Sequence, residues 1–355
     1  MTPEDQAMAA AFRTQIGWCR PTAPFTADLL EAILRDFEAG GGWRGLLGGW
    51  AAEPIADAAT LRAIGGVHRL ALMGVEPFKA VYARLDRDAK ALDEAARAAA
   101  AWPDMPRWLE NPPQTNETMR SAVFLGGFLE VARAQGLPLR MREMGASAGL
   151  NLLWDRYRFK LGDTVFGPED SPVRLEPKWE GPSPEPAPIV LASSKGVDQL
   201  PIDLSDPQQR FRLLSYVWAD QADRLDRMRG AVELARQALP VVEQGDAADW
   251  VERELAELPA GQTTVLYHSY VWQYLPRATQ DRVTAALEAA GRRTGPDTGL
   301  AHLALESAHG TELTNLTLTL WPGGETRVLA EAHPHGRWVA LARRLILLVL
   351  VRARE

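Results

Sequence analysis

Residues 145–149, Gly-Ala-Ser-Ala-Gly, are all small and stand between two patterned segments near the middle of the chain. The segment before them begins at Leu139 and alternates apolar and polar residues, which is typical of a strand. The segment after them has apolar residues at helical spacing. A strand, a small-residue turn and a helix make the layout of a nucleotide-binding corner, because glycines let the backbone approach a ligand and a helix N-terminus offers unpaired N–H groups. Glu143, just before the turn, could bind an ammonium or hydroxyl group of such a ligand.

The turn matches two functional motifs and also has an interpretation without a ligand. As Glu-x-Gly-x-x-x-Gly-x-Asn, with Glu143 and Asn151 at its ends, it resembles the first motif of S-adenosylmethionine-dependent methyltransferases. As Gly-x-Ser-x-Gly it matches the nucleophile elbow of α/β-hydrolases, with Ser147 exposed on a strained turn. A tight turn between a strand and a helix would have the same composition. Short glycine motifs often match by chance, so the rest of the chain has to decide.

Acidic residues follow the next two predicted strands, at residues 189–192 and 240–243. The carboxyl ends of strands form the ligand crevice of an open α/β sheet. In a methyltransferase-like sheet, Asp198 would accept the ribose hydroxyls and Asp246 would lie beside the adenine amine. Glu143 and Asp198 are 55 positions apart, more than the usual spacing of about 20, so an inserted hairpin and a proline-rich loop must fill the interval. The residues expected to bind the cofactor S-adenosylmethionine are Glu143, Gly145, Ala146, Ser147, Gly149, Asn151, Asp198 and Asp246.

A histidine follows the fourth predicted strand, residues 263–267. In a methyltransferase-like sheet this position faces the transferred methyl group, and His268 could deprotonate a nucleophile there because its pKa lies near neutrality. A hydrogen-bonded structural histidine is the alternative. The predicted catalytic residues are His268, Tyr270 and Gln114.

Gln114 begins a polar run, residues 114–120, that enters a predicted apolar helix. Thr115 or Asn116 could cap that helix. The run is more polar than a cap requires, so a role facing a substrate or cofactor is equally open. Asn116, Glu117 and Arg120 are therefore predicted to bind substrate.

Two further positions complete the predicted substrate site. Gln273 lies shortly beyond the fourth strand, and His335 belongs to the sequence His-Pro-His-Gly at residues 333–336. On a strand, His333 and His335 would share a face and could bind a metal. No cysteine or acidic cluster adjoins them, so a solvent-edge or pocket-lining role is favoured and no metal site is predicted.

The hydrolase interpretation of Ser147 needs elements that the sequence does not favour. An elbow serine normally follows several strands and an oxyanion loop, whereas residues 1–110 have helical patterns. Asp246 and His335 follow Ser147 in the order of a possible triad, but no other motif supports them. This interpretation is the less favoured one.

The elements that must position these residues fall into two regions. Residues 1–112 have helical patterns without a convincing strand and predict a helical N-terminal domain or cap. Residues 113–355 alternate strands with helices, which predicts a mostly parallel α/β sheet. A hairpin at residues 313–332 adds antiparallel pairing. This order resembles a doubly wound, Rossmann-like methyltransferase sheet that ends in an antiparallel hairpin. The apolar run at residues 345–351 predicts a final helix.

Composition narrows the functional classes. The chain has 355 residues and a net charge of -7, which argues against a general nucleic-acid-binding role. Its one cysteine excludes internal disulfides and cysteine-rich zinc sites. The first residues form no apolar signal region, and no apolar run reaches about 18 residues. We therefore expect a cytoplasmic protein without membrane contact, and the oligomeric state stays open.

Short motifs over nearly the whole chain resemble one bacterial family. They lie at residues 114–117, 143–151, 155–157, 201–203, 217–218, 268–269, 321–324 and 333–336. Together they are similar to domain-of-unknown-function family 2332 (DUF2332), an uncharacterised family similar in fold to S-adenosylmethionine-dependent methyltransferases. The resemblance implies this fold more than an activity.

The favoured hypothesis is a methyltransferase-like enzyme that transfers a methyl group from S-adenosylmethionine to an unknown small-molecule acceptor. The helical N-terminal region would cover the crevice and help define that acceptor. The alternative, from another functional class, is a non-catalytic protein that binds a nucleotide or other small ligand on the same fold.

Overall fold

The computed structural model describes residues 1–307 and 313–342. The helix predicted at residues 345–351 lies outside this range. The chain divides into two compact units. The first contains Met1–Asn116 and Ile202–Leu239, and the second contains Glu117–Pro201 and Pro240–Glu355.

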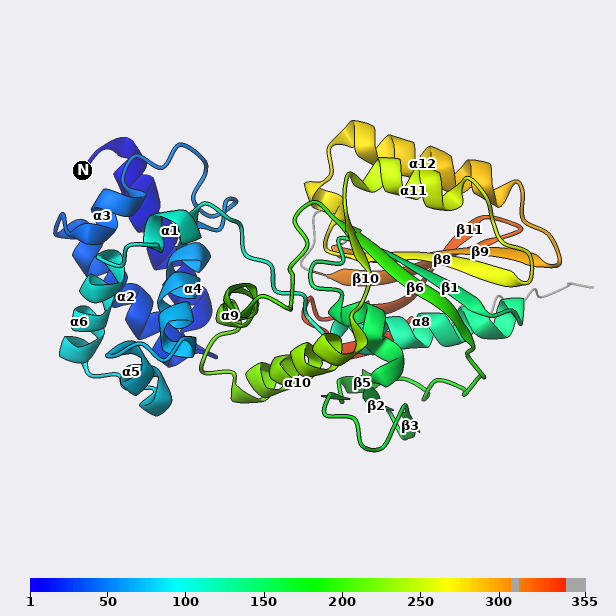
Figure 1. Cartoon of the computed structure of the whole chain (residues 1–355), viewed down its shortest axis with the longest axis horizontal. Coiled ribbons are helices and arrows are strands. Elements are labelled where there is room, and N and C mark those ends of the chain that lie inside the picture. The colour runs from blue at the N-terminus through cyan, green and yellow to red at the C-terminus, as the bar shows by residue number, and fades with distance from the viewer. Residues whose placement is uncertain (308–312, 343–355) are drawn as a thin grey trace, which may run out of the picture. The chain divides into compact units, whose positions relative to one another are not determined.

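The first unit is helical, which confirms the prediction of a helical N-terminal region (Figure 1). The buried apolar residues between Met8 and Leu109 form one core. Thr2 begins the first helix with a capping box, because its hydroxyl accepts a hydrogen bond from the Asp5 N–H and the Asp5 carboxylate accepts one from the Thr2 N–H. The helices are α1 (Pro3–Cys19), α2 (Pro24–Glu38), α3 (Gly42–Leu47), α4 (Ala59–Leu72), α5 (Phe78–Arg84), α6 (Ala89–Ala100), α7 (Met105–Leu109), α9 (Pro207–Ser215) and α10 (Ala222–Ala238).

The segment Ile202–Leu239 is joined to the N-terminal helices by specific hydrogen bonds. The residue that precedes α2 offers no side-chain cap. Asp220 replaces it, since its carboxylate accepts hydrogen bonds from the backbone N–H of Phe25 at 2.8 Å and of Thr26 at 3.0 Å. These bonds satisfy amide groups that a helix N-terminus leaves unpaired.

The second unit contains a large mixed sheet. Its strand order is β5-β12-β11-β10-β9-β8-β1-β6-β7. The strands from β9 to β7 in this order are parallel, and β10 and β11 form the predicted antiparallel hairpin. The strands are β1 (Leu139–Met144), β5 (Lys178–Glu180), β6 (Leu191–Asp198), β7 (Val242–Gln244), β8 (Gln262–Ser269), β9 (Thr298–Ser307), β10 (Thr314–Trp321), β11 (Glu325–Ala332) and β12 (Trp338–Leu341).

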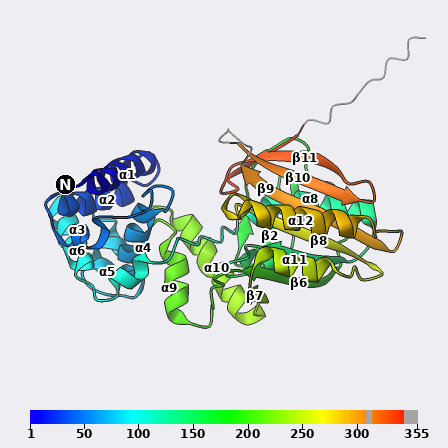
Figure 2. The same ribbon diagram turned by 90° about the horizontal axis from the view of Figure 1, so that it is seen from above.

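Helices cover both faces of this sheet. Helix α8 (Arg120–Gln135) lies on one face, and α11 (Ala247–Leu255) and α12 (Arg277–Gly291) lie on the other (Figures 1 and 2). The alternation of β1 follows this division. Glu143 lies beside Tyr267, whose ring contacts the phenylalanines of α8. Met144 belongs to the apolar core shared with α11 and α12.

The segment after the small-residue turn differs from its prediction. It forms a 3-10 helix, η1 (Leu150–Arg156), in place of an α-helix, and Leu153 departs from helical backbone angles. Its apolar residues are buried on every side, so their spacing does not mark one helical face. The Tyr157 hydroxyl donates a hydrogen bond of 2.6 Å to the Leu150 carbonyl. The turn therefore has no α-helical N-terminus, and the expected contribution of a helix dipole is absent there.

The interval between η1 and β6 holds the inserted hairpin that the sequence predicts. Strands β2 (Arg158–Leu161) and β3 (Thr164–Phe166) pair antiparallel around Gly162, which has a φ of +62°. Strand β4 (Arg174–Leu175) pairs with β2 to complete a small second sheet.

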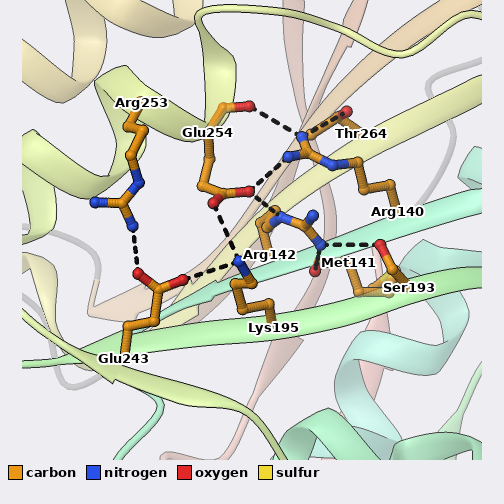
Figure 3. A network of polar contacts seen from close by, with 9 residues as sticks. All are labelled: Arg140, Met141, Arg142, Ser193, Lys195, Glu243, Arg253, Glu254 and Thr264. Atoms are coloured by element: carbon orange, nitrogen blue, oxygen red, sulfur yellow. Dashed lines mark hydrogen bonds and ion pairs between the residues drawn. The ribbon is translucent and has the colours of Figure 1, made fainter.

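A charged cluster lies between the main sheet and α11 (Figure 3). We call it the Glu254 network; its members are Arg140, Arg142, Lys195, Glu243, Arg253 and Glu254. The Arg142 Nε lies 2.6 Å from the Glu254 carboxylate, and both side chains are more than nine-tenths buried. Burial alone would raise the pKa of Glu254, but the hydrogen bond from Arg142 and the surrounding positive charges lower it.

None of the helices in the described part of the chain combines the length and apolar character needed to cross a bilayer.

Candidate functional site

The carboxyl ends of three parallel strands bring several predicted residues to one edge of the sheet. Strand β1 lies between β6 and β8, and all three run in the same direction. The small-residue turn follows β1, while Asp198 ends β6 and Ser269 ends β8. Because the three strands are parallel, their carboxyl ends lie side by side at one edge of the sheet. The turn, Asp198 and Ser269 therefore share this edge.

The turn and Asp198 are joined directly. The Asp198 Oδ2 accepts a hydrogen bond of 2.8 Å from the Ser147 N–H, and its Oδ1 accepts one of 2.9 Å from the Leu200 N–H. Ser147 has a φ of +54°, in the left-handed region that residues other than glycine rarely adopt. The bond to Asp198 helps to hold this strained backbone in place.

The Ser147 hydroxyl is buried and has no hydrogen-bond partner among the described residues. The residue is 6% exposed. A buried polar group without a partner is unfavourable, and the exceptions in folded proteins often mark functional positions or sites of bound water. The Ser147 hydroxyl is therefore a candidate contact for a bound water or ligand at this turn.

The small residues around Ser147 allow close packing within the chain. A Cβ at Gly145 would lie 2.8 Å from Val271 Cγ2, and a Cβ at Gly149 would lie 2.9 Å from the Pro240 side chain. Ala146 packs against Gly196 in the same manner. Gly145 and Gly149 also have positive φ values of +67° and +72°. The structure thus gives these glycines a conformational and packing role, in addition to any approach of a ligand to the backbone.

Glu143 is buried on the α8 side of the sheet. It is 2% exposed, and its Oε2 accepts a hydrogen bond of 3.3 Å from the Tyr267 hydroxyl. Burial raises the pKa of Glu143 well above its usual value, and the charge of Asp198 adds to this effect. Burial thus disfavours the charged carboxylate relative to an exposed glutamate. Nearby, the Asn151 amide oxygen accepts a hydrogen bond of 2.7 Å from Ser121.

The start of α8 contacts the turn that precedes β12. Glu117 is 1% exposed, accepts a hydrogen bond of 3.1 Å from the Met119 N–H, and lies 3.9 Å from the His335 Nδ1. The Arg120 Nε donates a hydrogen bond of 3.0 Å to the Pro334 carbonyl. The predicted substrate residues Glu117, Arg120 and His335 therefore lie together.

His333 and His335 belong to a turn between β11 and β12, not to a strand. The His335 N–H donates a hydrogen bond of 2.9 Å to the His333 Nδ1. In the described residues, no group of three or more histidine, cysteine or acidic side chains is arranged to hold a metal ion.

His268 has an internal partner for each ring nitrogen. Its Nδ1 lies 2.7 Å from the Glu306 carboxylate, and its Nε2 lies 3.0 Å from the His302 Nε2. Burial lowers the pKa of His302 to about 3, so this ring is neutral at ordinary pH. His268 is 1% exposed and shares the face of Met144, opposite to Glu143. This arrangement is that of a hydrogen-bonded structural histidine.

The remaining predicted residues occupy separate positions. The Tyr270 hydroxyl contacts that of Thr314, and the Tyr270 ring lies beneath the Arg120 guanidinium at 4.5 Å. Gln273 is exposed in the 3-10 helix η2 (Trp272–Tyr274). Gln114 and Asn116 belong to the first unit.

Asp246 is the N-cap of α11. Its Oδ1 accepts hydrogen bonds from the backbone N–H of Ala248 at 2.8 Å and of Asp249 at 3.1 Å. The predicted contact with the adenine amine would have to coexist with this capping role.

The Asp246→Ala variant separates the two roles. Loss of the cap should lower the free energy of unfolding by about 0.5–2 kcal/mol, which thermal or chemical denaturation would measure. If Asp246 also contacts adenine, binding of S-adenosylhomocysteine should weaken by about 1.5–3 kcal/mol, and binding of its inosine analogue much less. An equal loss of affinity for the two ligands would mean that Asp246 caps α11 and does not contact the adenine amine.

Two partners of His268 do not stand out in the sequence. His302 and Glu306 follow the period-two alternation of β9. The spacing of His302 and Glu306 places them on one face of a strand. Their pairing with His268 depends on the neighbouring strand, for which a local pattern carries no signal.

A family model described as "Uncharacterized protein conserved in bacteria (DUF2332)" matches residues 9–340. No curated protein and no solved structure matches the chain.

Proposed function

We propose that the chain, which belongs to the DUF2332 family, is an S-adenosylmethionine-dependent methyltransferase that acts on a small-molecule acceptor. The description of that family names no activity, so the proposal rests on the geometry of the sheet edge. A cytoplasmic location, and an acceptor other than nucleic acid or membrane, belong to the same proposal.

The hydrogen bond between the Ser147 N–H and Asp198 is the observation that carries this proposal. The chain passes from β1 to β6 on one side and later returns to β8 on the other, so the strand order reverses at β1. Open α/β sheets bind ligands at such a switch point, beyond the carboxyl ends of the strands. The parallel order β7-β6-β1-β8-β9 supports a Rossmann-like doubly wound sheet, to which β10 and β11 add the antiparallel hairpin.

The chemistry of the side chains fits a ligand with hydroxyl and ammonium groups and no phosphate. Asp198 would accept hydrogen bonds from ribose hydroxyls, and the unpartnered Ser147 hydroxyl could donate or accept one. The Asp198 charge and the absence of an α-helical N-terminus both disfavour a phosphate at this turn. When bound, S-adenosylmethionine supplies an electrophilic methyl group on its sulfonium.

Roles for the other predicted residues follow from their positions. Glu143 and Asn151 would line the α8 side of the turn, while Glu117, Arg120 and His335 would bind the acceptor. Catalysis by His268, Tyr270 or Gln114 stays a prediction. Deprotonation by His268 would first require one of its two internal hydrogen bonds to open.

The serine hydrolase is a second candidate, which the positive φ and unpartnered hydroxyl of Ser147 favour. A nucleophilic serine needs a base within hydrogen-bonding reach. None of the described residues bonds this hydroxyl, and η1 replaces the helix that follows an elbow. The methyltransferase is therefore the better-supported candidate.

Calorimetric titration of the full chain with S-adenosylmethionine and S-adenosylhomocysteine tests the proposal, with adenosine monophosphate as a phosphate-bearing comparison. We expect saturable binding of the first two and weaker binding of the third. Absence of binding by either sulfur compound would contradict the proposal. Transfer of a labelled methyl group to an acceptor would separate an enzyme from a ligand sensor, and labelling of Ser147 by a fluorophosphonate would favour the hydrolase.

A further inference from the structure

Two arginines of the first unit, Arg69 and Arg212, belong to helices that pack against each other. Helices α4 and α9 pack closely because Gly65 has no side chain: a Cβ there would lie 2.7 Å from the Tyr216 ring. His68 Nδ1 lies 3.1 Å from the Ser215 carbonyl in the same contact. Residues four apart share a helix face. Arg69, four residues after Gly65, therefore lies on the α9 side of α4, and Arg212 lies four residues before Tyr216.

The hydrogen bonds of these arginines confirm the geometry. The Arg69 Nη2 donates to the Gln208 carbonyl at 3.0 Å and to the Gln208 side-chain oxygen at 3.1 Å. Gln208 is four residues before Arg212 on α9. The Arg212 Nη2 donates to the Gln114 side-chain oxygen at 3.0 Å. Amide and carbonyl oxygens thus hold both guanidinium groups in place without neutralising them.

Both guanidinium groups keep a donor that no described residue accepts. Each Nε is buried and has no hydrogen-bond partner within residues 1–307 and 313–342. Within the described residues, the hydrogen bonds of both arginines go to carbonyl and amide oxygens, and neither arginine forms an ion pair with a carboxylate. Burial lowers the pKa of Arg69. Tyr216 acts in the opposite direction, the charge of Arg212 lowers the pKa by a smaller amount, and Asp104 and Asp206 raise it. Arg69 is therefore partly desolvated and interacts electrostatically with Arg212, while Asp104 and Asp206 act on it without forming an ion pair.

Trp108 fixes the orientation of one of the two groups. The Arg69 guanidinium lies over the Trp108 ring at 4.3 Å from its centroid. Stacking restricts the guanidinium plane, which lowers the cost of ordering it when a ligand binds.

We propose that Arg69 and Arg212 form a binding site for the oxyanion group of a small ligand in the helical unit. A guanidinium fork matches the geometry of phosphate and carboxylate oxygens. A phosphate dianion also matches the two positive charges, so we favour a phosphate group over a carboxylate as the bound oxyanion. Gln114, which the sequence places in a polar motif, serves here to position Arg212. The site is independent of the proposed methyltransferase function.

Calorimetric titration of the full chain with inorganic phosphate tests this site, against sodium chloride at equal ionic strength. Acetate and succinate replace phosphate in parallel titrations. We expect saturable phosphate binding that weakens about 10- to 100-fold in Arg69→Gln and in Arg212→Gln, the range for a lost hydrogen bond between charged groups. The matched control is Arg84→Gln, which removes an exposed charge from α5 of the same unit and should leave affinity unchanged.

Each outcome decides the proposal. Loss of phosphate binding in the two site variants, with no loss in the control, supports it. The same pattern with acetate or succinate supports the oxyanion site and assigns it to a carboxylate. No saturable binding of any of the three anions, or an equal loss in Arg84→Gln, overturns it. Should the glutamine variants unfold, Arg69→Lys retains the charge without the fork and is expected to weaken binding while circular dichroism stays unchanged.

Discussion

The Asp198→Ala variant is expected to lose most of its affinity for S-adenosylhomocysteine. Under the proposed function, the carboxylate accepts hydrogen bonds from the ligand and also holds the Ser147 N–H at 2.8 Å. One hydrogen bond to a charged group contributes about 1.5–3 kcal/mol, which corresponds to about one to two decades in affinity. Release of the turn should add to this loss, because the left-handed Ser147 backbone would no longer be held. Calorimetric titration measures the effect.

Two further variants separate the ligand contact from the turn. Asp198→Asn keeps an oxygen that can accept from the Ser147 N–H but removes the negative charge, so we expect a smaller loss of affinity. Asp163→Ala removes an exposed charge from the β2–β3 hairpin of the same unit and should leave binding unchanged. If wild type binds the ligand and Asp198→Ala binds it equally well, the ligand sits elsewhere on the protein.

The edge that carries Asp198 could be foreseen in outline from the sequence. Period-two alternation located β1, and short apolar segments followed by polar residues indicated β6, β7 and β8. Strand boundaries were less certain: Asp198 was expected after a strand that was predicted at 189–192, whereas it is the last residue of β6. The local sequence pattern does not show where the hydrogen-bonded pairing of a strand ends, because that pairing depends on the neighbouring strand.

Other features depend on contacts between distant segments. Residues 150–154 have the apolar spacing of a helix, yet they are buried all round in a 3-10 helix, and spacing cannot separate these two cases. The hydrogen bonds from α2 to Asp220 join positions almost 200 residues apart. The two internal partners of His268 likewise come from another strand. A local pattern predicts element types well, but it does not specify such partners.

The largest loss of stability is expected from Glu254→Gln. Glu254 is the only acid of the Glu254 network that contacts both Arg140 and Arg142 in the described residues (Figure 3). Its side chain is 8% exposed and that of Arg142 is 6% exposed. A glutamine of similar shape keeps one acceptor oxygen but leaves two largely buried guanidinium groups without their shared negative charge. Removing one partner of a buried ion pair typically costs about 3–5 kcal/mol.

A neighbouring glutamate provides the matched control. Glu252 lies on the same helix and pairs with Arg282, but both side chains are 44% exposed. Such surface pairs contribute about 0–1 kcal/mol, so Glu252→Gln should have little effect. Urea denaturation followed by circular dichroism compares the two variants, and hydrogen exchange of the β1 amides assigns the loss to the second unit.

A compensating variant tests whether the cost comes from uncompensated charge. Replacing a whole buried ion cluster with apolar residues is often neutral or stabilising, whereas removing one member is not. Adding Arg140→Met and Arg142→Met to Glu254→Leu should therefore recover much of the stability that Glu254→Gln loses. If stability is not recovered, the loss in Glu254→Gln comes from altered packing beneath α11 more than from uncompensated charge. If Glu254→Gln costs no more than Glu252→Gln, the negative charge of Glu254 does not stabilise the second unit, and hydration or other acceptors suffice for the two buried arginines.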